Sequence, residues 1–284
     1  MKIALLPNLT RKHALAVTNE TCKNLDELSL EYFFPDNLKT QLDFNYKFLP
    51  QDLLLNSCDV VIAIGGDGSI IHAAKQAALY KKPILGINAG NLAFMAGIEK
   101  HELKMLANLA EHNYSIDKRM MLRVELNDSE KTNNIKYCLN DVVIARGEQI
   151  KLINLNISSD GKKINDYFAD GVILSTPTGS TAYSLSAGGP VVDPKIESIM
   201  LTPICTHSLF ARSIIFDKQS EIIVEIPTDN REKIFISCDG DNSFELKNGN
   251  KIIVKKAEIS ADFIRIKTDS FIDVLNSKLT QRRV

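Results

Sequence analysis

A carboxylate stands among three glycines in the segment Gly65-Gly66-Asp67-Gly68, which follows five apolar and mostly β-branched residues, 60–64. The apolar run predicts a strand buried on both faces, and the glycines predict a sharp turn at its end. A helix is expected behind the turn, over residues 69–80, with Ser69 as its cap. Backbone N–H groups at a glycine turn and at a helix N-terminus attract anions, so the segment predicts a phosphate-binding loop.

The role of Asp67 needs a separate explanation, because a carboxylate beside a phosphate is electrostatically unfavourable without a metal or a reacting proton. Two roles fit: a general base that takes a hydroxyl proton during phosphoryl transfer, or a carboxylate close to a magnesium ion. The alternative is a tight strand-to-helix turn in an ordinary α/β domain, since short glycine motifs also occur by chance.

A second segment that suits a ligand covers residues 175–186, which include seven serines and threonines and one aliphatic residue larger than alanine. A segment so poor in apolar side chains is unusual if packing is its purpose. Hydroxyl groups donate and accept hydrogen bonds, as an uncharged polar ligand such as a ribose or an amide requires. The alternative is a polar loop followed by a serine-capped helix.

The elements that must position these segments differ between the two halves of the chain. The first part predicts strands at residues 2–6, 29–34, 60–64 and 84–87, and helices at 13–28, 69–80 and 99–111. Strands that alternate with helices favour a parallel sheet with right-handed crossovers, in which ligands bind at the carboxyl ends of the strands. The glycine turn and the loop 86–97 therefore belong at the same edge of the sheet.

From about residue 117 the pattern changes to short, partly alternating segments separated by Asn, Asp and Gly, which is typical of antiparallel β structure. The predicted strands cover residues 121–126, 138–145, 152–158, 162–168, 214–216, 222–226, 234–238, 244–246, 252–259 and 263–266. We therefore expect an α/β N-terminal domain with a parallel sheet over 1–117, and a mainly antiparallel β C-terminal domain over 118–267. Residues 268–284, with apolar side chains at helical spacing, are expected to return as a helix to the first domain.

Composition argues against several classes of function. The 284 residues carry 34 basic and 35 acidic side chains and a net charge of −1, which argues against nucleic acid or a membrane as a partner.

The five cysteines form no CxxC pair and the apolar N-terminal run is too short for a secretory signal, so a reducing, cytoplasmic location is expected. A zinc site from Cys205, His207 and Cys238 lacks the usual paired spacing, and no protein metal site is predicted. Neither GxxxxGK[ST] nor GxGxxG occurs.

Four segments together resemble the motifs of the NAD kinase family, in its order and at its spacing: residues 65–68, 88–94, 140–141 and 170–190. The first motif is shared with diacylglycerol, sphingosine and phosphofructokinases, whereas residues 176–184 are nearly diagnostic of NAD kinases. The resemblance implies transfer of the γ-phosphoryl group of ATP to the 2′-hydroxyl of the adenosine ribose of NAD, which gives NADP. It also implies a divalent cation such as Mg²⁺, a site between the two domains, and a homo-oligomer, either dimer or tetramer.

The same resemblance implies roles for individual residues. Asp67 would accept the proton, Asn140 and Asp141 would hold the ribose hydroxyls and adenine, and Phe94 would flank the adenine. Asp141 is one methylene shorter than the glutamate usual in the family, and Asp241 stands where a ligand-contacting glutamine is common. The full nucleotide-binding set implied is Gly65, Gly66, Gly68, His72, Asn88, Phe94, Arg119, Asn140, Asp141, Lys151, Asp170, Thr178, Thr181, Ala182, Tyr183, Ser184, Leu185 and Ser186.

Other interpretations of these residues stay open at this point. His72, Arg119 and Lys151 have solvated or structural alternatives, and an Asn-Asp pair is also a common turn. A lipid or sugar kinase built on the same glycine-aspartate loop is one rival, although a lipid kinase needs an apolar acceptor cavity. A non-catalytic dinucleotide sensor is another, but a sensor gains nothing from a carboxylate that faces the phosphates.

Overall fold

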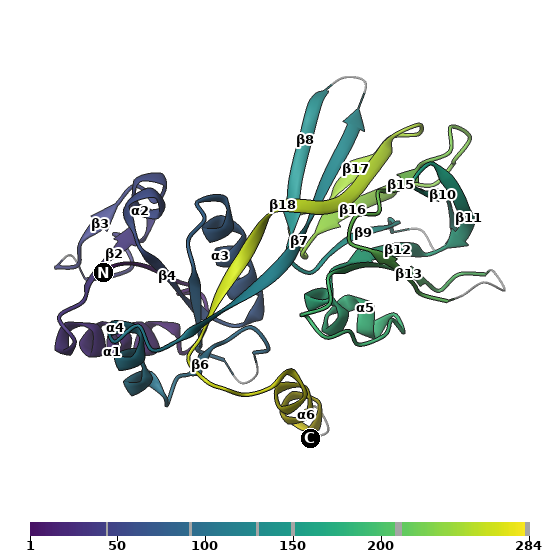
Figure 1. The fold of residues 1–284 in the computed structure, drawn as a ribbon. Coiled ribbons are helices and arrows are strands. Elements are labelled where there is room, and N and C mark those ends of the chain that lie inside the picture. Colours follow the sequence, from purple (N-terminus) through teal and green to yellow (C-terminus); the bar gives the residue numbers. More distant parts are fainter. Residues whose placement is uncertain (44, 91–92, 129–130, 149–150, 208–211, 282–284) are drawn as a thin grey trace. The chain divides into compact units, whose positions relative to one another are not determined.

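The computed structural model describes residues 1–43, 45–90, 93–128, 131–148, 151–207 and 212–281 (Figure 1). The chain divides into two compact units, unit 1 with Met1–Lys118 and Ile259–Val284, and unit 2 with Arg119–Glu258. The chain passes between the units within strand β7, Ser115–Asp128, and within strand β18, Lys251–Arg265. Each unit has its own core and is described by itself.

Unit 1 is built on a parallel sheet in the order β5-β4-β1-β2-β3. Its central strand β4 is buried along its whole length, as expected for a strand covered on both faces. Alternate residues of β4, Val60, Ile62 and Ile64, join the side chains of α1 in one apolar cluster, and α3 packs against β4 and β5. The strands are β1 (Lys2–Pro7), β2 (Glu31–Pro35), β3 (Phe48–Leu49), β4 (Val60–Gly65), β5 (Ile84–Asn88) and β6 (Ile98–Glu99).

The helices of unit 1 are α1 (Ala14–Glu27), η1 (Asp36–Leu38), α2 (Gln51–Ser57), α3 (Asp67–Leu79), η2 (Leu103–Leu106), α4 (Ala107–Ala110) and α6 (Phe271–Gln281). Figure 1 shows α1 beside α4, and α1 also contacts η2. Two predictions were wrong here. Ser69 does not cap α3, because the helix already begins at Asp67 after Gly66, and the single helix predicted over 99–111 is a 3-10 turn followed by the short α4.

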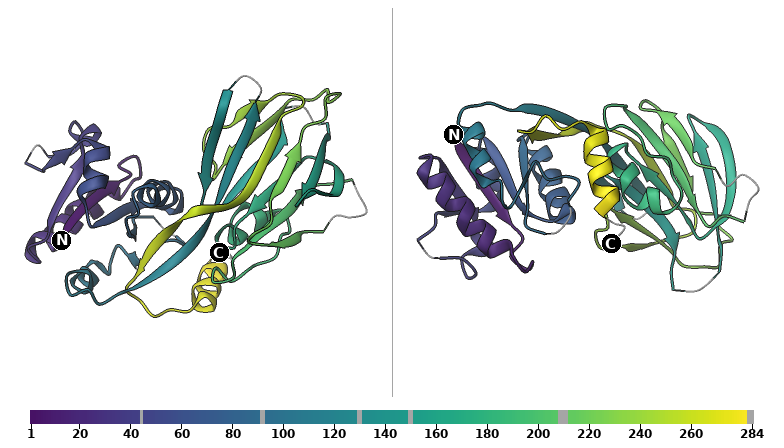
Figure 2. Two further views of the ribbon diagram at one scale, coloured as in Figure 1. Left: turned by 45° about the horizontal axis from the view of Figure 1, so that its top comes forward. Right: turned by 90° about the horizontal axis from the view of Figure 1, so that it is seen from below.

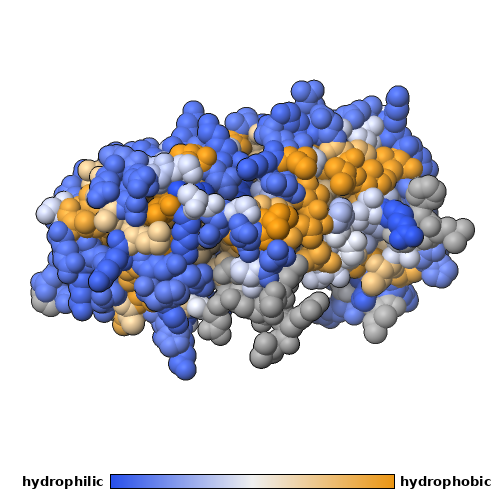
Figure 3. All heavy atoms as spheres, turned by 60° about the horizontal axis from the view of Figure 1, so that its bottom comes forward, coloured by the Kyte–Doolittle hydropathy of each residue, from blue (hydrophilic) through white to orange (hydrophobic). Residues whose placement is uncertain are grey.

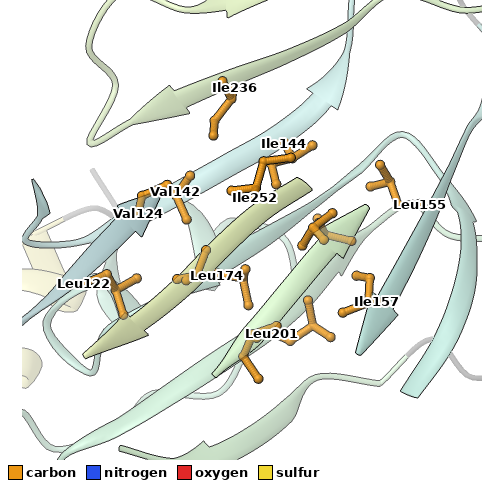
Figure 4. Close-up of a cluster of buried hydrophobic side chains, with 14 of the residues drawn as sticks. Leu122, Val124, Val142, Ile144, Leu155, Ile157, Leu174, Leu201, Ile236 and Ile252 are labelled. Atoms are coloured by element: carbon orange, nitrogen blue, oxygen red, sulfur yellow. The ribbon is translucent and has the colours of Figure 1, made fainter. Parts of the chain in front are cut away.

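Unit 2 consists of strands in two layers, seen from further directions in Figure 2. One sheet has the antiparallel order β14-β13-β12-β9-β16-β17, and the other contains β11-β10-β15-β18 with the hairpin of β7 and β8. Inward-facing side chains of both sheets form one apolar core, and Figure 4 shows Val142, Leu174 and Ile236 among them. The other elements are β8 (Lys131–Cys138), β9 (Asp141–Arg146), β10 (Ile153–Ser159), β11 (Lys162–Ala169), β12 (Gly171–Ser175), η3 (Thr178–Thr181), α5 (Tyr183–Ser186), β13 (Ser198–Ile204), β14 (Ile214–Asp217), β15 (Ile222–Glu225), β16 (Ile234–Cys238) and β17 (Phe244–Leu246).

The predicted fold class is confirmed: an α/β unit with a parallel sheet, a mainly antiparallel β unit, and a C-terminal helix. Single strands were less well predicted. The strand expected over 138–145 is interrupted between Cys138 and Asp141, where β8 ends and β9 begins, and the two expected over 252–266 are one strand, β18. Across the described residues, no helix combines the length and apolar character that crossing a membrane requires.

Candidate functional site

The carboxylate of Asp67 is held by the loop that follows β5. Asp67 is the first residue of α3, and its Oδ2 and Oδ1 accept hydrogen bonds from the backbone N–H groups of Phe94 (3.0 Å) and Met95 (2.8 Å). Hydrogen bonds to an ionised group are stronger than neutral ones, and a negative side chain in the first turn also interacts favourably with the helix dipole. These contacts explain how a carboxylate is stable in an anion-binding turn, which the sequence left open.

The glycines of the turn have two different roles. A Cβ atom on Gly65 would lie 2.6 Å from Cβ of Ser69, so only glycine allows the first turn of α3 to approach β4 this closely. On Gly66 and Gly68 a Cβ would meet no atom within 4 Å, so both face open space. The first N–H groups of a helix have no partner within the helix, and here they lie beside this open backbone. The turn therefore has room for a phosphate group, and phosphate binding there stays a prediction.

The other predicted residues of unit 1 lie in two places. Asn88 is fully buried, its Nδ2 donates to Glu99 (2.7 Å) and its Oδ1 accepts from the N–H of Gly90 (2.8 Å), so both polar groups of the amide shape the loop. Phe94 is partly buried, whereas His72 is exposed on α3 with its ring within 3.0 Å of the Gln76 amide. Asn91 and Leu92 of the same predicted motif lie outside the described residues.

In unit 2, Asp239 organises the backbone around the predicted pair Asn140 and Asp141. Its carboxylate accepts the N–H groups of Leu139 (2.8 Å), Asn140 (2.7 Å) and Asp141 (3.0 Å). Asp239 has a φ of 51° and precedes Gly240 with 73°, and the N–H of Asp241 closes the turn on the carbonyl of Cys238. Two successive positive φ angles at Asp-Gly are typical of a type I′ turn, and the pairing of Cys238 with Val142 places Asp239 beside the residues that precede β9.

The hydroxyl-rich segment folds directly onto the same backbone. The N–H of Thr176 donates to the carbonyl of Asn140 (2.8 Å) and its hydroxyl donates to that of Leu139 (2.6 Å). A Cβ atom on Gly179 would lie 2.1 Å from the carbonyl oxygen of Asn140, so the two segments are in contact only because residue 179 is glycine. Thr178 is buried and its hydroxyl lies 3.2 Å from the guanidinium of Arg119, which is also buried.

Two polar groups at this place have hydrogen-bonding capacity left for a ligand. Oδ1 of Asn140 is buried and has no hydrogen-bond partner among the described residues. Asp141 is 5% exposed, and burial, reinforced by the negative charge of Asp239, raises the pKa of its carboxyl group to about 7. Because unpaired buried polar groups are costly, such a pair favours a ligand that supplies hydrogen bonds. We call Arg119, Asn140, Asp141, Thr178 and Asp239 the Asn140 group.

The structure changes the interpretation of the hydroxyl-rich segment. Several of its hydroxyls serve the fold: Ser180 exchanges hydrogen bonds with the backbone of Val192, and Ser184, which is fully buried, bonds to Thr202 (3.0 Å). The sequence argument that the segment does not pack was therefore wrong for these positions. The predicted residues that reach the surface are Thr181, Ala182, Tyr183, Leu185 and Ser186.

Two predicted residues of unit 2 lie away from the Asn140 group. Asp170 accepts a hydrogen bond from Nε of Arg146 (2.6 Å), and Lys151 pairs with Glu232 (3.3 Å). Asp141 and Arg146 are the two ends of β9, so about five steps of 3.4 Å, or about 17 Å, separate the Asn140 group from Arg146. The residues predicted to bind one dinucleotide thus form two groups within unit 2.

Sequence reasoning missed the roles of Asp239 and Arg146. The Asp-Gly dipeptide after a predicted strand signals a hairpin turn, but nothing in it indicates that the carboxylate bonds to residues about one hundred positions earlier. Arg146 follows a predicted strand without any motif, and its partner Asp170 is recognisable only from the sheet register, which places Gly171 opposite Ala145.

Comparison with known proteins gives a consistent result for both units. The chain matches the ATP-NAD kinase N-terminal domain over residues 3–114 and the ATP-NAD kinase C-terminal domain over residues 139–266. It is 36% identical to the NAD kinase of Thermoanaerobacter sp. (strain X514) over 99% of both chains. It is 38% identical to the NAD kinase of Carboxydothermus hydrogenoformans over 78% of this chain and 80% of the relative.

Solved structures of the same fold include two with bound nucleotides. Yeast NADH kinase complexed with NADH superposes with a TM-score of 0.90 at 25% identity, covering 99% of this chain and 87% of that one. A NAD kinase from Archaeoglobus fulgidus in complex with ATP superposes with a TM-score of 0.75, covering 100% and 99%, and at 22% identity it supports the fold alone.

Proposed function

The chain belongs to the NAD kinase family, and we propose that it transfers the γ-phosphoryl group of ATP to the 2′-hydroxyl of the adenosine ribose of NAD. In this reaction a bond forms between the 2′-oxygen and the γ-phosphorus, and the bond from that phosphorus to the bridging oxygen of the β-phosphate breaks. The products are NADP and ADP, and the hydroxyl proton must leave the ribose. The names of the relatives favour this reaction over a lipid or sugar kinase and over a dinucleotide sensor.

The observation that carries the proposal is the position of Asp67 in the glycine turn, as the first residue of α3. The N–H groups of Phe94 and Met95 fix its carboxylate in one orientation. An aspartate is a far weaker base than a ribose alkoxide, so it takes the proton late, as the bond to phosphorus forms. Most of the rate enhancement then comes from positioning and from stabilising charge on the transferred group.

The Asn140 group is the proposed site of the acceptor nucleotide. Oδ1 of Asn140, which lacks a partner, can accept a hydrogen bond from a ribose hydroxyl or an adenine amino group. The neighbouring carboxyl group of Asp141 can accept hydrogen bonds from the same ligand. Tyr183, 47% exposed at the start of α5, offers an aromatic surface to the adenosine.

A divalent cation, most simply Mg²⁺, would accompany ATP. No group of three His, Cys, Asp or Glu side chains suited to a metal ion occurs among the described residues. In kinases Mg²⁺ is bound mainly through phosphates and water, and Asp67 in the glycine turn is the carboxylate of this chain that would lie beside the donor phosphates. When bound, the cation neutralises charge on the β- and γ-phosphates.

We also propose that the protein works as a homo-oligomer. Asp170 and Arg146 lie at the far end of β9 from the Asn140 group, so a second copy could bring its Asp170 to a nucleotide held by the first. Figure 3 shows apolar side chains gathered on one face of the molecule, and the exposed large apolar residues of unit 2 include Phe168, Val191 and Ile196. The reducing, cytoplasmic location predicted from the sequence stays a proposal.

The test is formation of NADP from NAD, ATP and Mg²⁺ by the purified protein, compared with two variants. Asp67→Asn removes the base but also places an amide N–H against one of the loop N–H groups, so Asp67→Ala is measured beside it. We expect kcat to fall by about 10²–10⁴ in both variants, the usual contribution of a general base. Calorimetric titration with NAD and with ATP shows whether each variant still binds its substrates.

The outcomes separate the alternatives. Turnover by the wild type, lost in variants that still bind NAD, supports both the reaction and the role of Asp67. A wild type that binds NAD without forming NADP would identify a sensor instead. Variants with kcat within tenfold of the wild type would show that Asp67 is not the base.

A further inference from the structure

A basic turn follows β1 at the same sheet edge as the glycine turn. Strands β1 and β4 are parallel neighbours with Pro7 opposite Ile64, so the chain leaves β1 beside the point where it leaves β4. The residues that follow are Asn8-Leu9-Thr10-Arg11-Lys12-His13, and Arg11, Lys12 and His13 are all exposed. We call residues 8–13 the β1 turn.

The β1 turn is held to the glycine turn by two hydrogen bonds of Asn8. Its N–H donates to the carbonyl of Ile64 (2.9 Å), and its Nδ2 donates to the hydroxyl of Ser69 in the first turn of α3 (2.8 Å). A Cβ built on Gly65 would lie 3.5 Å from Cβ of Asn8, which is ordinary van der Waals contact. The two turns therefore form one rigid rim at the carboxyl end of the sheet.

A β-turn brings the backbone of Arg11 back towards Asn8. Oδ1 of Asn8 accepts hydrogen bonds from the N–H (3.2 Å) and the hydroxyl (2.7 Å) of Thr10, and the carbonyl of Asn8 accepts the N–H of Arg11 (3.2 Å). A bond from residue i to i+3 closes a β-turn, which keeps the Cα atoms of Asn8 and Arg11 within about 7 Å of each other. The long side chain of Arg11 can thus reach the ligand side of the glycine turn.

The charge balance of the site requires a cation that the glycine turn lacks. ATP brings several negative charges to a turn that already contains the carboxylate of Asp67, and backbone N–H groups contribute only partial positive charge. Arg11 and Lys12 form no ion pair among the residues that the structure describes, so their charges are not neutralised there. Because the whole chain has a net charge of −1, this basic turn is not part of a generally basic surface.

We propose that Arg11 and Lys12 bind the triphosphate of the donor nucleotide, an inference that rests on the proposed kinase function. The planar guanidinium of Arg11 would donate two parallel hydrogen bonds to phosphate oxygens. The ammonium group of Lys12 would attract the phosphates as a positive point charge. Asn8 positions both by fixing the turn. The acceptor nucleotide does not use these residues.

The test compares Arg11→Gln, Lys12→Gln and the double variant with the wild type and with Lys23→Gln. Lys23 is a matched control because it is a cation on α1 of the same unit, its side chain is 72% exposed, and it pairs with Glu20 on its own helix. We expect KM for ATP to rise about tenfold or more in each single variant, the effect of a lost hydrogen bond to a charged group. KM for NAD should stay within about threefold of the wild type, and Tm within about 2 °C.

The result separates this inference from the proposed function. If the wild type forms NADP and the double variant keeps its KM for ATP, or instead raises KM for NAD, the inference is wrong and the kinase assignment stands. If the wild type forms no NADP, titration with ATP·Mg²⁺ decides: weaker binding in the double variant but not in Lys23→Gln supports the inference, and equal binding overturns it.

Discussion

The titration of Asp141 predicts how the stability of unit 2 depends on pH. Its carboxyl group is 5% exposed, and burial together with the charge of Asp239 raises its pKa from 3.8 to about 7. The folded protein therefore keeps this proton at pH values where the unfolded chain has lost it. Below about pH 4 both states are protonated, and Asp141 does not affect the free energy of unfolding. As pH rises above 4, the retained proton makes the folded state progressively less stable relative to the unfolded chain. Above about pH 7 this loss of stability is constant.

The magnitude follows from the shift. A difference of about 3 pKa units at 1.36 kcal/mol each gives about 4 kcal/mol of stability lost between pH 4 and pH 8. Asp141→Asn keeps the shape of the side chain and cannot ionise. The substitution also changes stability by an amount that does not depend on pH. Beyond that, the free energy of unfolding of the variant, relative to the wild type, should increase by about 4 kcal/mol from pH 4 to pH 8.

Differential scanning calorimetry from pH 4 to pH 8 measures this effect. For a unit of about this size, 4 kcal/mol corresponds to a relative increase in Tm of about 8–16 °C. Asp160→Asn is the matched control, because Asp160 is exposed and the backbone N–H of Glu221 lowers its pKa, so its effect is constant above pH 5. A difference in Tm between Asp141→Asn and the wild type that does not change with pH would refute the reasoning.

Two further predictions concern the backbone that shapes the site. Gly179→Ala should destabilise unit 2 by about 3 kcal/mol or more and abolish NAD binding, because its Cβ would lie 2.1 Å from the carbonyl oxygen of Asn140. Gly66→Ala should lower the free energy of unfolding by only about 1 kcal/mol, because its Cβ meets nothing within 4 Å and alanine is merely a poorer N-cap than glycine. Chemical denaturation checks both, and equal midpoints would contradict the role of the contact. Asn88→Ala should lower kcat about tenfold, because the loop that holds Asp67 loses the hydrogen bonds of Asn88 with Glu99 and Gly90. Titration should show that NAD still binds. An unchanged kcat would show that the loop is fixed in another way.

The sequence predicted the features that depend on short-range patterns. The apolar run before Gly65 predicted a buried strand, and Gly65 to Gly68 predicted the turn and the helix behind it, because strand burial and glycine turns have local signatures. The start of the helix was wrong by three residues, since the residue before α3 is Gly66 and not Ser69. Helix ends depend on backbone hydrogen bonds that residue type alone does not determine.

The interactions that complete the candidate site could not be predicted, because they join distant residues. The bonds from Asp239 to residues 139–141 and from Asp67 to the N–H groups of Phe94 and Met95 depend on sheet register and loop path. Polar composition was also misleading for Ser180 and Ser184. A hydroxyl that satisfies a buried neighbour has the same sequence signature as one that binds a ligand.

The contact between Asp239 and Asn140 also has a consequence for the order in which the protein forms during synthesis. Translation proceeds at about 5–20 residues per second, so Asn140 leaves the ribosome several seconds before Asp239 can supply its carboxylate. Strand β18, which pairs with β15 in unit 2 and with β5 in unit 1, is made later still. We expect a nascent chain to assemble the glycine turn and α3 early, and to acquire the Asn140 group only after Asp239 has left the ribosome.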